Sequence, residues 1–176
     1  MPPVTVLRRC VSLLLISALT IAGPALAQEQ QGCVAPEYRQ FDFWIGSWSV
    51  TNPKGIIAGT NRIESILGGC VLQEHWRSAG GGDGTSLNMW NAADSTWRQV
   101  WMDAGGNLLE LKGKLVGNQM ILSGKRPTAG QPGGLTVDRV TWTPLPNGTV
   151  RQFWESSTDD GATWTTAFDG LYAREP

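Results

Sequence analysis

The sequence is poor in the residues that build metal centres and nucleophile–base pairs. It contains one histidine, His75, and three cysteines among 176 residues. The ligand spacings typical of zinc sites are absent. With a single histidine in the chain, a base for a serine or cysteine nucleophile cannot be assigned from the sequence. We therefore expect neither a metal nor a cofactor.

The sequence also lacks an apolar run long enough to remain in a membrane. Its longest run, residues 11–21, is shorter than the roughly 20 residues that a spanning helix needs. Arg8-Arg9 precede this run and Ala25-Leu26-Ala27 follow it, which is the pattern of a cleaved secretory signal. The chain is thus expected to be exported, to the periplasm or outside the cell, without a stable membrane anchor. We predict three regions, namely a signal peptide over 1–27, a polar lead containing Cys33 over 28–35, and one domain over 36–176.

Basic charge is not in excess either. Loss of Arg8 and Arg9 with the signal would leave 12 basic and 15 acidic residues, and no basic patch stands out. Nucleic acid is therefore not expected as a partner.

Cys33 and Cys70 would remain after cleavage of the signal. An even pair in an oxidising compartment predicts one disulfide, and the alternative is two separate buried thiols.

No window of the sequence shows helical periodicity over three turns. Short β-prone segments alternate with glycine-rich turns, and Asn147-Gly148 is a strong hairpin signal. Pro36 opens a short helix. We predict an all-β fold, a single antiparallel meander β-barrel of about ten strands with a short N-terminal helix; a β-sandwich is the alternative. The strands are expected near 44–52, 58–67, 70–77, 85–91, 96–102, 107–114, 118–123, 136–143, 149–156 and 163–173.

Tryptophan is abundant, with nine against four phenylalanines and two tyrosines. Residues two apart share a face of a strand, which pairs Gln99 with Trp101 and Gln152 with Trp154. If these faces are interior, the two indoles supply apolar walls, and the two amides together with Arg139 supply polar contacts. These five residues are our candidate ligand contacts. The alternative is a polar network that is filled by side chains or water.

The stretch "PEYRQFDFWIGSWSV" and the closing "FDGLYAREP" resemble the lipocalin-like (calycin) barrels. More closely, the chain looks like an uncharacterised bacterial family with an FDFW-x-G-x-W opening, distantly similar to nitrobindin-type barrels. The resemblance implies that Gly46 and Trp48 lie on the first strand and that Arg174 packs over Trp48 to close one barrel end. Nitrobindin-type barrels hold haem through a histidine near the C-terminus. No histidine follows His75 here, so no haem-binding residue is carried over.

A second short motif lies near the end of the chain. Ser157-x-Asp159-x-Gly161-x-x-Trp164 looks like the Asp-box of sialidases and related propellers. In that motif the Asp and Ser hydrogen-bond a hairpin turn and the Trp packs beneath it. One copy carries no catalysis, so we interpret these four residues as a structural hairpin.

The expected function is that of an exported lipocalin-like barrel which binds a small hydrophobic or amphipathic molecule. One alternative is an enzyme of the isomerase or cyclase type, which would need a titrating group in the cavity such as Glu74, Asp103 or Glu155. Another is an envelope interaction module with a filled barrel. We expect binding rather than catalysis, and the sequence predicts no oligomeric state.

Overall fold

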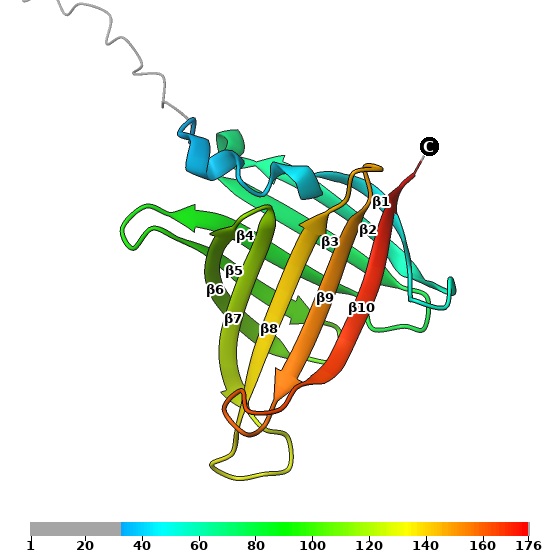
Figure 1. The fold of residues 1–176 in the computed structure, drawn as a ribbon, viewed down its shortest axis with the longest axis vertical. Helices are drawn as coiled ribbons and strands as arrows, with labels where there is room; N and C mark the ends of the chain where they lie inside the picture. The colour runs from blue at the N-terminus through cyan, green and yellow to red at the C-terminus, as the bar shows by residue number, and fades with distance from the viewer. Residues whose placement is uncertain (1–32, 176) are drawn as a thin grey trace, which may run out of the picture. The chain divides into compact units, whose positions relative to one another are not determined.

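The computed structural model describes residues 33–175, which form a closed antiparallel barrel (Figure 1). Each strand pairs with its neighbours in sequence, and β1 pairs with β10 to close the sheet. The predicted fold class is thus confirmed. The strands are β1 (Gly46–Thr51), β2 (Ile57–Ile66), β3 (Val71–Ser78), β4 (Gly84–Asn91), β5 (Thr96–Asp103), β6 (Leu108–Val116), β7 (Gln119–Pro127), β8 (Leu135–Pro144), β9 (Val150–Ser157) and β10 (Thr165–Arg174).

The short N-terminal helix takes the form of two 3₁₀ turns, η1 (Pro36–Arg39) and η2 (Asp42–Trp44). Pro36 begins η1, a position where its missing N–H is not needed. The predicted signal peptide over 1–27 lies outside the described residues. Among the residues that are described, no helix is long and apolar enough to cross a membrane.

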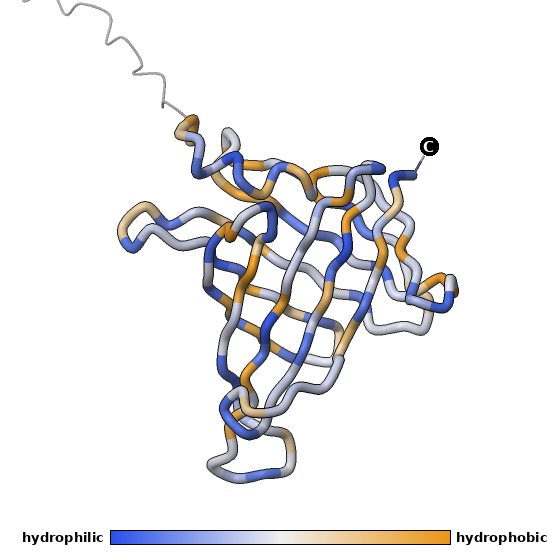
Figure 2. Tube along the Cα trace, in the orientation of Figure 1, coloured by the Kyte–Doolittle hydropathy of each residue, from blue (hydrophilic) through white to orange (hydrophobic). Residues whose placement is uncertain are grey.

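The strands alternate between a buried and a more exposed face. In β8, for example, Asp138, Val140 and Trp142 are buried, whereas Arg139 and Thr141 between them are partly exposed. The same alternation of hydrophobic and hydrophilic residues runs along other strands of the barrel (Figure 2). Side chains of the buried set converge on the barrel axis, so one strand face fills the interior.

One end of the barrel is closed by rings from η2, from the residue before it and from two strands. Phe41 stacks on Trp44 at 5.0 Å between ring centroids and meets Trp97 and Trp142 edge-on at 5.6 and 5.1 Å. All four rings are buried. Such offset and edge-to-face pairs add to the stability gained by burying the rings. We call these four rings the aromatic plug.

Gly46, Trp48 and Arg174 meet beside the aromatic plug, as the resemblance implies. The Arg174 guanidinium lies 4.4 Å from the centroid of the Trp48 ring and donates a hydrogen bond of 3.1 Å to the carbonyl of Ile45. Gly46 has φ of 141°, and a Cβ there would lie only 2.3 Å from Arg174 Nη1. The glycine is therefore needed both for its backbone conformation and for the space it leaves to the guanidinium.

Cys33 and Cys70 form a disulfide, with their Cα atoms 4.9 Å apart. This bond joins the segment before η1 to the residue that precedes β3. Arg39 at the end of η1 also donates a hydrogen bond to the carbonyl of Gly69. The two links hold the N-terminal turns on the closed end of the barrel.

Candidate functional site

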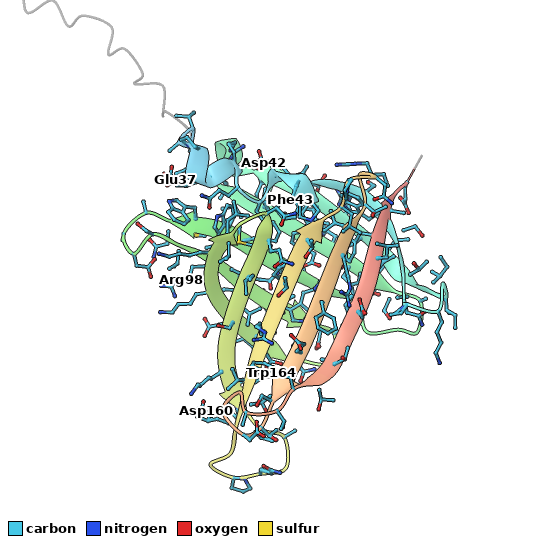
Figure 3. All side chains as sticks on the ribbon, viewed as in Figure 1. Glu37, Asp42, Phe43, Arg98, Asp160 and Trp164 are labelled. Carbon is cyan, nitrogen blue, oxygen red and sulfur yellow. A yellow bond between two sulfur atoms is a disulfide. The ribbon has the colours of Figure 1, made fainter. Side chains whose placement is uncertain are left out.

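A cavity of about 370 Å³ lies inside the barrel. Its wall residues come from β2, β3, β5, β6, β8, β9 and β10, and none of them belongs to the aromatic plug. In Figure 3 the two ends of the barrel are marked by Phe43, in η2, and by Trp164, in the β9–β10 loop. The residues that line the cavity are Ala58, Glu74, Trp76, Ser78, Gln99, Trp101, Leu109, Val140, Gln152, Trp154, Ala167, Phe168 and Tyr172.

Aromatic rings form much of the cavity wall. Trp76 and Phe168 meet edge-on at 5.9 Å between their centroids. Trp101 fits against Gly84 of the neighbouring strand, where a Cβ would lie 2.3 Å from Cζ2 of the indole. Glycine at this position therefore gives the indole the space in which it lies.

Trp154 is held in place by the buried carboxylate of Asp138, which pairs with the partly exposed Arg126. Its Nε1 donates a hydrogen bond of 2.7 Å to Asp138 Oδ1, which also accepts one of 2.5 Å from Ser156 Oγ. Arg126 Nε donates to the other carboxylate oxygen at 2.7 Å. Asp138 is completely buried, and these three donors and the Arg126 charge compensate for the loss of water. The Trp154 ring is thereby fixed as one wall.

The floor of the cavity is polar. Glu74 is 3% exposed; its Oε1 accepts a hydrogen bond of 2.7 Å from Asn61 Nδ2, and its Oε2 accepts one of 2.6 Å from Ser86 Oγ. Because the single proton of Ser86 goes to Glu74, the hydroxyl oxygen acts as acceptor for Asn88 Nδ2 at 2.8 Å and Gln99 Nε2 at 3.3 Å. These side chains form one connected network.

Burial shifts the titration of two groups in this floor. Loss of solvent raises the pKa of Glu74 to about 7, although the hydrogen bonds from Ser86 and Asn61 act in the opposite direction. Burial, followed by the nearby Glu74 carboxyl, raises the pKa of Tyr172 well above its usual range. The tyrosine hydroxyl therefore keeps its proton, which it donates to Gln152 Oε1.

The structure brings four of the five candidate ligand contacts together. Gln99, Trp101, Gln152 and Trp154 all line the cavity. The placement of Arg139 on an inner face was wrong, because strand alternation turns its neighbours Asp138 and Val140 inward and Arg139 outward.

On the outer face, Arg139 serves the hairpin instead. Its Nη2 donates to Glu155 Oε2 at 2.9 Å, and its guanidinium lies 4.0 Å from the centroid of the Trp164 ring. The Asp-box residues surround this ring. Ser157 Oγ donates to Asp159 Oδ1 at 2.6 Å and accepts the backbone N–H of Gly161 at 2.8 Å. Trp164 Nε1 donates to the carbonyl of Gly161 at 3.0 Å, so the loop is internally bonded.

The three acidic residues named for an enzyme occupy different environments. Glu155 is on the outer face with Arg139, and Asp103 accepts hydrogen bonds from Asn107 in the β5–β6 turn. Only Glu74 of these three lines the cavity. Its neighbour His75 points to the outer surface, 3.5 Å from Glu64, so Glu74 and His75 do not act together.

Sequence reasoning named Glu74 only as a titrating group for the enzyme alternative and did not place it among the candidate ligand contacts. The signal was present in the alternation Leu72-x-Glu74-x-Trp76, which places the carboxyl between two large apolar residues on one strand face. Its partners Asn61 and Ser86 carry no such signal, because single polar residues in a strand are usually exposed.

Comparison with known proteins adds no family assignment, since no family model and no curated protein matched the chain. The closed ten-stranded antiparallel barrel is consistent with a lipocalin-like fold.

Proposed function

We propose that this chain is an exported lipocalin-like barrel that binds a small, partly hydrophobic molecule inside its cavity. The observation that carries the proposal is a cavity of about 370 Å³ with indole walls and a polar floor. Ligand pockets in proteins are typically about 300–1,000 Å³, mostly apolar, with a few placed polar groups. A barrel filled completely by side chains predicts no such cavity.

In this proposal the apolar part of the ligand lies against Trp101 and Trp154. Its polar part is directed at the polar groups that line the cavity, Gln99, Gln152 and Glu74, of which Gln99 and Glu74 are buried. The access route runs past Ala167, which lines the cavity and is exposed. Export is supported by the Cys33–Cys70 disulfide, because such bonds persist in oxidising compartments.

Native mass spectrometry of the protein purified from its own host tests both parts of the proposal. We expect a mature mass that corresponds to cleavage after Ala27 with the disulfide formed, and a co-purifying small molecule that is released on activation. Repeated recovery of empty protein would count against a carrier, and an uncleaved chain would refute export.

A matched pair of variants tests the location of the ligand. Ala167→Phe places a ring at the cavity mouth, whereas Ala173→Phe places the same ring on the outer face of the same strand. We expect the first variant to weaken binding at least tenfold in a tryptophan-fluorescence titration against lipids and aromatic compounds, and the second to leave it unchanged. Equal effects of both variants would place the binding site elsewhere.

A further inference from the structure

Two carboxyl groups are fully enclosed by the barrel, and they differ in their partners. Asp138 is paired with the Arg126 guanidinium at 2.7 Å. Glu74 is bonded to an amide and a hydroxyl, and within the described part of the chain it forms no ion pair with a basic side chain. A buried carboxylate without a counter-charge is strongly disfavoured. The cavity therefore holds one acidic group whose charge is not neutralised by residues 33–175.

Hydrogen-bond acceptors are also in excess around this group. The buried carbonyl oxygens Asn61 Oδ1 and Asn88 Oδ1 have no hydrogen-bond partner among the described residues. Both amides donate within the network, Asn61 to Glu74 and Asn88 to Ser86. Buried polar atoms in native proteins are almost always paired. Neither asparagine lines the cavity, so the acceptor that a ligand meets is the Glu74 carboxyl itself, which favours a ligand that supplies N–H donors.

The walls of the same cavity suit a cation. Besides Tyr172, four aromatic residues line it, and the negative face of an aromatic ring attracts an ammonium group placed within about 6 Å. A volume of about 370 Å³ equals that of roughly a dozen water molecules in the liquid, which suits a ligand with a similar number of non-hydrogen atoms. The four residues are Trp76, Trp101, Trp154 and Phe168.

We propose that the cavity selects a small organic ammonium ion, with its apolar body between Trp101 and Trp154 and its N–H groups directed at the Glu74 carboxylate. This inference rests on the proposed function and adds the chemical class of the ligand. In the complex the ammonium is the missing counter-charge, so Glu74 must release its proton to solvent when the ion binds.

Binding should therefore depend on pH through Glu74. The groups that face it are Tyr172 from β10, Asn61 from β2 and Ser86 from β4, of which only the tyrosine titrates, far above neutral pH. His75, Arg62 and Glu64 project from the outer face. With a pKa of about 7, Glu74 is about 1% ionised at pH 5 and about 90% ionised at pH 8, so affinity should rise roughly 90-fold over this range.

Isothermal titration calorimetry with phenethylammonium and the neutral 2-phenylethanol at pH 5 to 8 tests the inference. The two probes have the same size, and the ammonium keeps its charge because alkyl amines titrate near the lysine value of about 10.4. At pH 8 we expect phenethylammonium to bind more tightly than 2-phenylethanol. The affinity for phenethylammonium should fall toward pH 5, whereas the affinity for 2-phenylethanol should not change with pH. Glu74→Gln should abolish this preference, whereas His75→Gln, which changes the neighbouring side chain on the outer face, should retain it.

The outcomes separate this inference from the proposed function. Binding of 2-phenylethanol as tight as that of phenethylammonium, without pH dependence, overturns the preference for a cation and leaves a cavity that binds neutral molecules. Binding of neither probe also overturns the inference, and the mouth variants at Ala167 and Ala173 then decide the proposed function separately. Should Glu74→Gln not fold, the pH dependence of the wild-type chain alone supports or refutes the inference.

Discussion

Glu74 should make this barrel less stable as the pH rises through neutrality. Its carboxyl is buried, and its pKa is raised from 4.5 to about 7. The folded state therefore binds a proton over a pH range in which the unfolded chain has already released it. Stability from this group is complete below pH 4.5 and is lost as the pH rises through 7. Glu74→Gln, which keeps the size of the side chain, removes the titration.

The magnitude follows from the shift. A difference of 2.5 pKa units corresponds to about 3 kcal/mol of unfolding free energy, of which about 2.5 kcal/mol is lost between pH 5 and pH 8. Other titrating groups are the same in both chains, so the difference between wild type and Glu74→Gln isolates this contribution. Relative to the variant, the wild-type chain should lose that amount of stability across the range.

Urea unfolding at several pH values, followed by tryptophan fluorescence with the disulfide intact, measures this difference. Glu110→Gln is the matched control, because Glu110 is exposed on the outer face of β6. Its unfolding free energy should run parallel to that of wild type at every pH. If the plot of unfolding free energy against pH for Glu74→Gln is also parallel to that of wild type, the Glu74 carboxyl has an ordinary pKa. The carboxyl is then better solvated than the 3% exposure of Glu74 indicates.

Two further predictions concern the closed end of the barrel. Trp48→Ala should reduce the unfolding free energy by about 3–5 kcal/mol, the usual loss for a large buried ring. Arg174→Ala should reduce it by about 0.5–2 kcal/mol, the contribution of a cation–π contact. Chemical denaturation measures both losses, and a Trp48→Ala variant of normal stability that no longer binds ligand would make Trp48 a contact residue instead. Replacement of Cys33 and Cys70 by serine should reduce the unfolding free energy by about 4 kcal/mol in the chain-entropy model for a separation of 37 residues, and an unchanged denaturation midpoint would contradict a structural role for the bond.

The sequence predicts this fold closely because its turn residues and its alternation of apolar and polar residues indicate the same strands. Asn147-Gly148 lies between β8 and β9 as expected, and the ten predicted strands correspond to the ten strands of the barrel. The contact of Arg174 with Trp48 was implied by the resemblance to lipocalin-like barrels, and the structure contains it. Strand alternation and turn chemistry are local signals, and a meander barrel joins only neighbouring segments apart from its first and last strands.

Val137 and Asp138 show where the local signal is misleading. In β8 the apolar Val137 points outward, while the charged Asp138 points inward, which inverts the usual pattern for a half-buried strand. This inversion is possible because Arg126, from the neighbouring strand β7, neutralises Asp138 inside the barrel. The partner is 12 residues away in sequence, and no rule about neighbouring positions identifies it. Polar groups in an interior are stabilised by such pairs, so their positions depend on the assembled barrel.

The tryptophans of this barrel have two different uses, and strand alternation alone cannot separate them. Trp97 and Trp101 both point inward from β5, yet Trp97 belongs to the aromatic plug and Trp101 to the cavity wall. Four residues of strand separate them by about 13 Å along the chain, which is enough to move from one end of the interior toward the other. What distinguishes the two indoles is the end at which η2 lies, next to the start of β1 and the contact of Arg174 with Trp48. Gln99 lies between them and belongs to the polar floor. An inward residue is therefore core or binding site according to its distance from the plug, so the search for ligand contacts in such a barrel begins with finding its closed end.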